Sequence, residues 1–178
     1  CLTKTTYSLA KLAYTKYSDR FVCSSIKNNA WWKFENHRWK RIEEGIFLRQ
    51  KISQEIVKIF EDKQSELFAK MSKSPESERD IYGVQIKLVQ KMIKQLKSHP
   101  FKVNVMKECK DVFYVETFLK TLDNNPWIIG FKNGVYDFGE KRFRDGTQND
   151  YLTFSTGYDY IDYDETCPHT QDIYKFLS

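Results

Sequence analysis

The sequence predicts an α+β fold: a mainly helical body with a small N-terminal antiparallel meander and a C-terminal β-hairpin region. Two long segments, 43–71 and 78–98, repeat apolar residues at helical spacing. Residues 21–42 hold three short β-forming segments separated by polar turns. Asn133-Gly134 lies between two short apolar segments and predicts a hairpin, because both residues accept positive φ at low cost.

The first forty residues predict one helix and three strands. Thr5 or Thr6 can cap an amphipathic helix over residues 5–19. The strands are expected over 21–25, 30–35 and 38–42. Because side chains alternate along a strand, Trp31 should face opposite to Trp32.

The middle of the chain predicts further helices. Glu43 and Glu44 suit the first turn of a long helix that ends near Met71, because acidic residues there complement the helix dipole. Its expected apolar stripe consists of Leu48, Ile52, Ile56, Ile59, Phe60, Leu67 and Phe68. A polar loop is expected over 72–80, and the second long helix over 78–98. The apolar stripe of that second helix is expected to be Ile81, Val84, Leu88, Val89, Met92 and Leu96. Shorter helices should follow over 100–111 and 114–122.

The C-terminal third predicts strands. Asp123 and the two asparagines after it should stop the preceding helix, and Pro126 prevents its return. Strands are expected over 127–129, 135–138, 151–154 and 158–161, with a further turn over 139–141 and a last helix beginning at Gln171.

The 178 residues are enough for one domain, which we expect to span 1–178. Within it we distinguish a basic, mostly helical part (1–120), a hairpin and strand part (121–165) and the start of a connector (166–178). The chain begins without Met and ends inside an expected helix, so we expect a piece of a longer protein. It contains no apolar run of membrane-spanning length and no signal peptide. Four cysteines, none in a C-x-x-C pair, favour free thiols in a reducing, intracellular setting over structural zinc.

The net charge of +5 conceals an asymmetry along the chain. Residues 1–120 hold 24 Lys and Arg against 14 Asp and Glu, whereas 121–178 hold 5 against 10. A basic body with an acidic tail indicates a polyanion partner for the first part, although ordinary solubility charge is an equally good interpretation.

Ten basic residues are candidate nucleic-acid contacts. Lys87, Lys91 and Lys94 follow the i, i+4, i+7 spacing and form a ridge on one helix face, where phosphates could offset their mutual repulsion. A solvated lysine face is the commoner meaning of such a pattern. The predicted meander contributes Lys33, Arg38, Lys40 and Arg41, and the hairpin contributes Lys132, Arg142 and Arg144.

Aromatic residues accompany the cations of the meander. Trp32, Phe34 and Trp39 could stack on bases, but aromatic residues more often belong to the core, and we expect them to pack on the long helix.

Catalytic chemistry is not indicated. The sequence has no phosphate-binding G-x-x-x-x-G-K-[ST] loop, and its three histidines lack carboxylates or cysteines at catalytic or metal-binding spacing. The acidic cluster over 159–165 lacks the glycine and the spacing of a calcium loop, so a solvated strand end is expected there. We assign no catalytic residue, no metal and no cofactor to this segment.

One stretch carries a family resemblance. L-D-N-N-P-W-I-I-G-F-K-N-G-V-Y-D-F resembles the signature of the domain that precedes the superfamily-three helicase in primase-helicases of large nucleocytoplasmic DNA viruses, and of some phages and plasmids. Phe138 replaces the usual aliphatic residue. Supporting matches are Tyr17-x-Asp19-Arg20-Phe21-Val22 and Trp32-Lys33-Phe34-x-x-His37-Arg38-Trp39.

The resemblance implies an accessory DNA-binding and assembly domain that contacts DNA phosphates and supports the collar of a hexameric helicase. The parent protein would be an ATP-dependent helicase and primase, with ATP and Mg²⁺ bound in its helicase domain. Its partners would be DNA and the helicase and primase domains of the same polypeptide, with no membrane, in the host cytoplasm or at a viral replication site. The alternative is a structural protein–protein interaction domain without DNA contact. A stand-alone nuclease or phosphotransferase is the weakest alternative.

Overall fold

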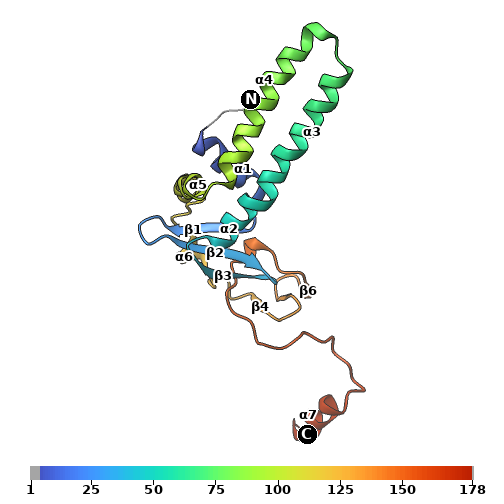
Figure 1. Cartoon of the computed structure of the whole chain (residues 1–178). Coiled ribbons are helices and arrows are strands. Elements are labelled where there is room, and N and C mark those ends of the chain that lie inside the picture. Colours follow the sequence, from blue (N-terminus) through green and yellow to red (C-terminus); the bar gives the residue numbers. More distant parts are fainter. Residues whose placement is uncertain (1–4, 178) are drawn as a thin grey trace. The chain divides into compact units, whose positions relative to one another are not determined.

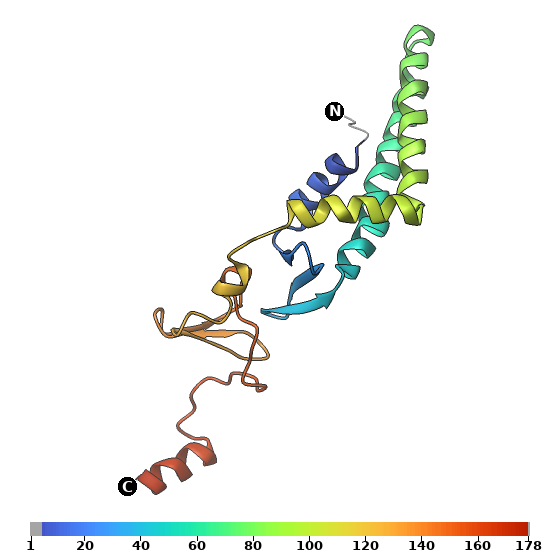
Figure 2. The ribbon, with the colours of Figure 1, turned by 90° about the vertical axis from the view of Figure 1, so that its left-hand side faces the viewer.

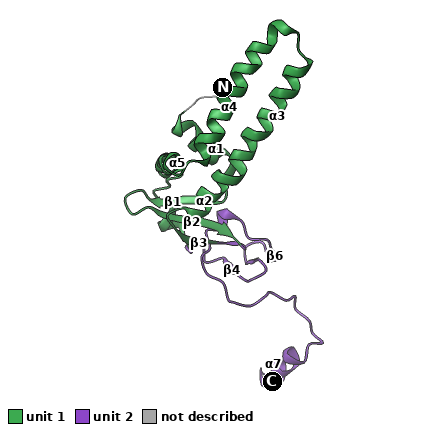
Figure 3. Cartoon of the chain, viewed as in Figure 1, with its two compact units in different colours: residues 1–35, 39–122 green, residues 36–38, 123–178 purple. Residues whose placement is uncertain are grey.

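The computed structural model describes residues 5–177 and divides the chain into two compact units (Figure 1 and Figure 3). Unit 1 comprises residues 1–35 and 39–122, and unit 2 comprises residues 36–38 and 123–178. The boundary after residue 122 lies close to the expected division after residue 120. The α+β class is confirmed, whereas the expectation of a single domain over 1–178 stays a prediction.

Unit 1 is mainly helical and contains the N-terminal sheet. Its strands are β1 (Phe21–Ser25), β2 (Ala30–Glu35) and β3 (Arg38–Glu43), of which the first residue, Arg38, is assigned to unit 2. Its helices are α1 (Thr6–Tyr17), α2 (Ile46–Lys51), the π-helical η1 (Ile52–Ile56), α3 (Val57–Lys73), α4 (Glu76–Lys97), α5 (His99–Val112) and α6 (Phe118–Thr121). The predicted cap is present, because Thr5 Oγ1 accepts a hydrogen bond from the Ser8 N–H at 3.2 Å.

The predicted meander is confirmed as a three-stranded sheet in the order β1-β2-β3. The β1–β2 pairing is antiparallel and sets Cys23 opposite Trp31. The side chains alternate as expected, since Trp31 is fully buried and Trp32 is half-buried. Asn36 and His37 adopt positive φ in the β2–β3 turn, which these residue types tolerate better than most.

The aromatic residues of the meander pack on a different helix from the one predicted. The ring centroids of Trp39 and Trp32 lie 5.1 and 5.7 Å from that of Phe118 in α6. Phe34 in turn lies 5.5 Å from Trp39. The aromatic residues thus serve the core, but they pack on the short helix α6, which lies within the helix predicted over 114–122.

The first long helix begins later than the sequence suggested. Glu44 and Gly45 both have positive φ, which ends the strand and excludes them from the first helical turn. Gly45 is also crowded: a Cβ there would lie 2.9 Å from Met106 Cε and 3.0 Å from the Trp31 ring. The helix therefore starts at Ile46, and the two acids stand before it rather than inside it.

The π-helical segment η1 changes which residues of this helix face the core. A π turn contains more residues than an α turn, so the apolar stripe is shifted after it. Ile52, Ile56 and Val57 are buried, whereas Ile59 and Phe68, both predicted to belong to the stripe, are exposed.

Helices α3 and α4 form an antiparallel pair that α5 crosses (Figure 2). They are joined at Ser74 and Pro75, so the polar loop expected over 72–80 is almost entirely helical. Buried Leu67, Ile86 and Val89 hold the pair together. The predicted α4 stripe is wrong at its N-terminal end, because Ile81 and Val84 are each 59% exposed.

Beyond α5 the chain pairs with β1 instead of continuing as a helix. The Cys23 N–H donates to the Phe113 carbonyl at 3.0 Å, and the Val115 N–H donates to the Cys23 carbonyl at 3.1 Å. These bonds draw residues 113–115 into an extended path, which leaves only Phe118–Thr121 of the helix predicted over 114–122.

Unit 2 is built on a second antiparallel sheet, in the order β4-β5-β6. Its elements are β4 (Ile128–Gly130), β5 (Val135–Asp137), β6 (Arg142–Arg144), the 3-10 helix η2 (Gln148–Asp150) and α7 (Pro168–Leu177). Buried Ile128, Val135 and Leu152 form its core.

The hairpin turn is present but works differently from the prediction. Neither Asn133 nor Gly134 has a positive φ angle. Gly134 is needed for close approach, since a Cβ there would lie 2.5 Å from Phe143 and 2.6 Å from the Arg144 carbonyl oxygen. Asn133 instead holds a distant segment, because its side chain accepts from the Tyr160 N–H at 2.8 Å and donates to the Tyr160 carbonyl at 3.0 Å.

The strands expected over 151–154 and 158–161 are absent, and this segment follows an irregular path. Separate hydrogen bonds hold this segment in place of the regular backbone pairing of a β-strand. The Asp123 carboxylate accepts from the N–H and the hydroxyl of Thr153, and the Thr156 N–H donates to the Gly130 carbonyl at 2.9 Å. A periodic sequence pattern indicates alternation but cannot distinguish a strand from a segment held by side chains.

The last helix, α7, starts at Pro168, three residues before the predicted start, and none of its described residues is buried. Over residues 5–177, no helix combines the length and the apolar character needed to cross a membrane.

Candidate nucleic-acid interface

The basic ridge of α4 presents uncompensated charge. Lys87, Lys91 and Lys94 are all exposed, and within residues 5–177 none forms an ion pair. The next lysine along the helix differs, because Lys97 Nζ lies 2.9 Å from Glu61 Oε1 of α3. Successive positions at i, i+4 and i+7 fall on one side of a helix, so the three ammonium groups share one face. The sequence prediction of a basic ridge on this helix therefore corresponds to a real face of α4.

The cations of the meander are arranged differently. Lys33 pairs with Glu35, and its ammonium also lies 4.5 Å from the centre of the Phe47 ring. Lys40 approaches the same carboxylate at 3.4 Å. The hydrogen bond from Lys33, followed by that from Lys40, holds the pKa of Glu35 below its usual value. Two of the predicted phosphate contacts thus share an internal counter-ion.

Arg38 and Arg41 lie in separate surroundings. Arg38 falls in unit 2, and its buried Nε has no hydrogen-bond partner among the described residues. Arg41 of unit 1 is exposed and lines a groove of about 550 Å³ together with Glu43 and Glu44. Those two carboxylates oppose the approach of a polyanion to Arg41.

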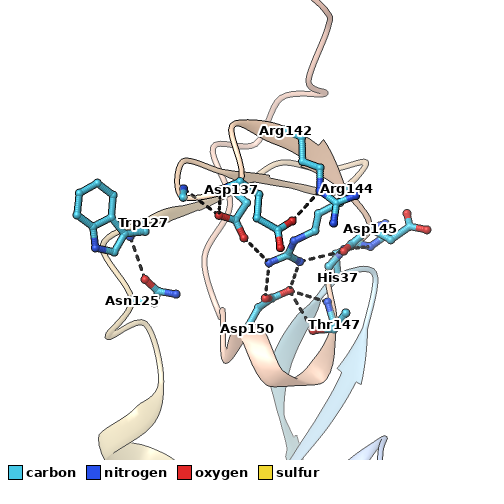
Figure 4. Close-up of polar contacts among 12 residues, drawn as sticks. His37, Asn125, Trp127, Asp137, Arg142, Arg144, Asp145, Thr147 and Asp150 are labelled. Atoms are coloured by element: carbon cyan, nitrogen blue, oxygen red, sulfur yellow. Dashed lines mark hydrogen bonds and ion pairs between the residues drawn. The ribbon is translucent and has the colours of Figure 1, made fainter.

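Arg144 is a structural residue of unit 2 (Figure 4). Its two terminal nitrogens reach both oxygens of Asp150 at 2.8 and 2.9 Å and Asp137 Oδ2 at 3.0 Å. One of them also donates to the Asp145 carbonyl at 3.2 Å. Only 21% of the Arg144 side chain and 9% of that of Asp150 are exposed. The Arg144 guanidinium therefore hydrogen-bonds to residues of its own unit.

The pKa shifts of these groups follow from this geometry. Burial alone would raise the pKa of Asp150, but the hydrogen bonds from Arg144 and from the Thr147 N–H outweigh it, so the pKa is lowered. The pKa of Asp137 is lowered mainly by the Glu140 N–H and then by Arg144. The same carboxylates raise the pKa of the Arg144 guanidinium.

The other two hairpin cations are exposed. Arg142 Nε lies 2.6 Å from Glu140 Oε2, an exposed pair that solvent screens (Figure 4). Lys132 forms no ion pair within the described part of the chain, and its backbone N–H donates to the Tyr158 carbonyl.

The ten candidate residues thus form no single surface. The structure brings three together on α4, joins two through Glu35 and places Arg144 inside unit 2. Sequence reasoning missed a further group of residues, the cations Arg49 and Lys102 with the imidazole of His99, which line one groove of unit 1. They come from segments fifty residues apart, and no local pattern links them. Over residues 5–177 there is no cluster of three or more His, Cys, Asp or Glu side chains suited to a metal ion.

The fold and these charges define an α+β module with an exposed cationic face on α4, where Lys87, Lys91 and Lys94 form no ion pair with any residue of 5–177. The chain belongs to the family described as D5 N terminal like, whose model matches residues 10–178.

Relatives come from large DNA viruses. The chain is 38% identical over 172 residues to the "Putative helicase L207/L206" of Acanthamoeba polyphaga mimivirus, covering 96% of this chain and 18% of that protein. It is 25% identical over 187 residues to the "Putative helicase 022R" of Frog virus 3 (isolate Goorha), covering 88% and 19%. A third relative is the "Putative helicase 121R" of Invertebrate iridescent virus 3, 36% identical over 104 residues, covering 56% and 11%. The chain spans less than a fifth of the length of these relatives.

Proposed function

We propose that this chain is an accessory DNA-binding and assembly domain of a viral replicative primase-helicase. The observation that carries the DNA part is the ridge of Lys87, Lys91 and Lys94, which no carboxylate of the described residues neutralises. The names of the relatives support the helicase context.

The ridge suits a phosphate backbone better than base edges. At a rise of about 1.5 Å per residue, Lys87 and Lys91 are about 6 Å apart along the helix axis and Lys91 and Lys94 about 4.5 Å, so about two helical turns offer three charges to one strand. Long ammonium side chains act as point charges without a rigid donor pattern, which favours affinity without sequence readout. With three phosphate contacts, a plot of the logarithm of the binding constant against the logarithm of the salt concentration should have a slope of about −2.7 for duplex DNA and about −2.1 for single strands.

The test is fluorescence anisotropy with single- and double-stranded oligonucleotides from 50 to 200 mM salt. If three phosphate contacts are made, raising the salt from 50 to 200 mM should weaken duplex binding roughly 40-fold. The triple variant K87Q/K91Q/K94Q should bind weakly and with a salt slope reduced by about 2 to 3.

A matched control removes the same number of charges from lysines that already have a carboxylate partner. Lys63, Lys70 and Lys97 are each paired with Glu66 or Glu61. K63Q/K70Q/K97Q should keep most of the affinity. Equal losses in the two triple variants, or no binding by the unaltered chain at 50 mM salt, would contradict the proposal.

At the level of the whole protein, we propose a hexameric, ATP-dependent helicase linked to a primase, in which this domain supports the collar. ATP and Mg²⁺ would bind in the helicase domain, and the segment after residue 165 would connect this domain to it. These assignments depend on the family, and the exposed, unpaired lysines of α4 support only the proposed contact with DNA.

A structural interaction domain without DNA contact is the second candidate. The observation that favours it is the exposed apolar surface of α7, where Ile173, Phe176 and Leu177 fall at i, i+3 and i+4 and are 60–88% exposed. Sedimentation velocity with and without DNA separates the candidates. Self-association that DNA leaves unchanged, together with flat anisotropy curves, would favour the second.

A further inference from the structure

A small groove of unit 1 collects cations that the proposed ridge does not include. It has a volume of about 250 Å³. Its lining comes from α2, η1 and the start of α5 and consists of Ile46, Arg49, Gln50, Ser53, Gln54, His99 and Lys102. This volume is below the roughly 300–1,000 Å³ typical of drug-sized ligand sites, so the groove suits a small polar group.

Apart from Ile46, the residues that line the groove are polar or cationic. Arg49, Lys102 and His99 supply two fixed positive charges and one imidazole, and no carboxylate lines the groove. Some lysines elsewhere in the described chain do have a carboxylate partner, as Lys51 and Lys70 show. Within residues 5–177 neither Arg49 nor Lys102 forms an ion pair, and both are half-buried, where solvent screens a charge less than at the surface.

Donors of the right kind converge on the same place. Arg49 offers a planar fork that matches two phosphate oxygens, and Gln50 and Gln54 carry amide donors. Ser53 does not contribute a free hydroxyl proton, since its Oγ donates to the Arg49 carbonyl at 2.9 Å.

The start of α5 adds to these side chains. Ser98 stands at the N-cap without a side-chain hydrogen bond, and Pro100 has no N–H. The first-turn N–H groups of a helix lack intrahelical acceptors and carry partial positive charge, which favours an anion beside His99.

We propose that this groove is a phosphate-binding site. The shared chemistry is a phosphate group, and its source is either a nucleic-acid phosphate or the phosphates of a free nucleotide. The nucleic-acid source rests on the proposed function, whereas the groove as such does not, because its residues are separate from the α4 ridge.

The test titrates the whole chain with inorganic phosphate, ATP and a 5′-phosphorylated twelve-nucleotide strand. The Arg49 Nε–H resonance and the backbone resonances of 99–102 are followed by NMR. All three probes should shift these resonances. The variant R49Q/K102Q should weaken the binding of each probe at least tenfold. K58Q/K107Q, which removes two exposed lysines outside the groove, should leave binding within twofold.

Two further variants keep the outcome decisive. R49K/K102R preserves both charges and should retain at least a third of the affinity, which a purely packing role would not predict. In the K87Q/K91Q/K94Q background the groove resonances should still respond to inorganic phosphate, even if DNA binding fails altogether.

Tighter binding of ATP than of the oligonucleotide would assign the site to nucleotides, and the reverse would assign it to nucleic acid. Groove resonances that none of the probes moves, or R49Q/K102Q binding like the K58Q/K107Q control, would overturn the proposal.

Discussion

Replacing Arg144 by methionine should destabilise unit 2, and the neighbouring Arg142 supplies a matched control. Both arginines lie in β6 and both pair with carboxylates, but Arg144 is 21% exposed whereas Arg142 is 63% exposed. Methionine keeps most of the length of the side chain and removes the charge. The comparison therefore isolates the contribution of a partly buried ion pair from that of an exposed one.

The magnitude follows from the Arg144–Asp150 geometry. Breaking a fully buried ion pair by removing one partner costs about 3–5 kcal/mol, and an exposed pair contributes about 0–1 kcal/mol. With Asp150 only 9% exposed and two bonds at 2.8 and 2.9 Å, the pair lies between these limits. We expect R144M to lower the free energy of unfolding by about 2–3 kcal/mol and R142M by at most about 0.5 kcal/mol.

Urea unfolding followed by circular dichroism measures the loss, and hydrogen exchange over residues 128–152 shows whether it falls in unit 2. The pH dependence gives a second check. The folded-state pKa of Asp150 lies below its unfolded value of about 3.9, so this stabilisation is present above that pH and is lost as the pH falls through the folded-state value. The difference between R144M and the unaltered chain should therefore shrink at pH 3. Equal effects of the two variants at pH 7 would refute the reasoning.

Two glycines should respond in opposite directions to alanine. G134A should lower the free energy of unfolding by about 1–3 kcal/mol, because its Cβ would clash with Phe143 and the Arg144 carbonyl, whereas G83A in α4 has open space and should raise it by about 0.5–1 kcal/mol. Urea unfolding measures both, and a stabilising G134A would show that the turn relaxes easily. Burial raises the pKa of Cys109 to about 12 and also raises that of Cys23, so both thiols should resist alkylation at pH 8 while half-buried Cys167 reacts. Peptide mass mapping after brief iodoacetamide treatment reads this out, and rapid labelling of Cys109 in the folded chain would contradict the burial.

Much of the fold follows from local sequence patterns. The meander, the cap at Thr5, the helix of 99–112 and the first two strands of unit 2 all lie where alternation, periodicity and turn residues placed them. The errors arise where distant contacts outweigh local preference. Residues 113–115 pair with β1 instead of continuing a helix, and Gly45 is fixed by Met106 and Trp31 from elsewhere in the chain.

The candidate site shows the same limit. Three lysines on one helix are visible from spacing alone, because their neighbourhood is their own helix. Whether a cation is free or engaged depends on which carboxylate folds next to it, and Arg144 illustrates the difference. The Arg49 and Lys102 groove needs α2 and α5 to meet, which no local pattern encodes.

The attachment of residues 153–160 has a mechanical consequence. This segment is held at separate points, by Asp123 at Thr153, by Gly130 at Thr156, by Lys132 at Tyr158 and by Asn133 at Tyr160. Tension applied through residues 161–167 reaches the Asn133 attachment before any other, and the remaining bonds would then bear the load one after another. Such peeling requires far less force than shearing a ladder whose bonds break together. We therefore expect the trailing segment of unit 2 to detach stepwise under load, beginning with the Asn133 bonds and the stacking of Tyr160 on Phe143, whose ring centroids lie 4.4 Å apart.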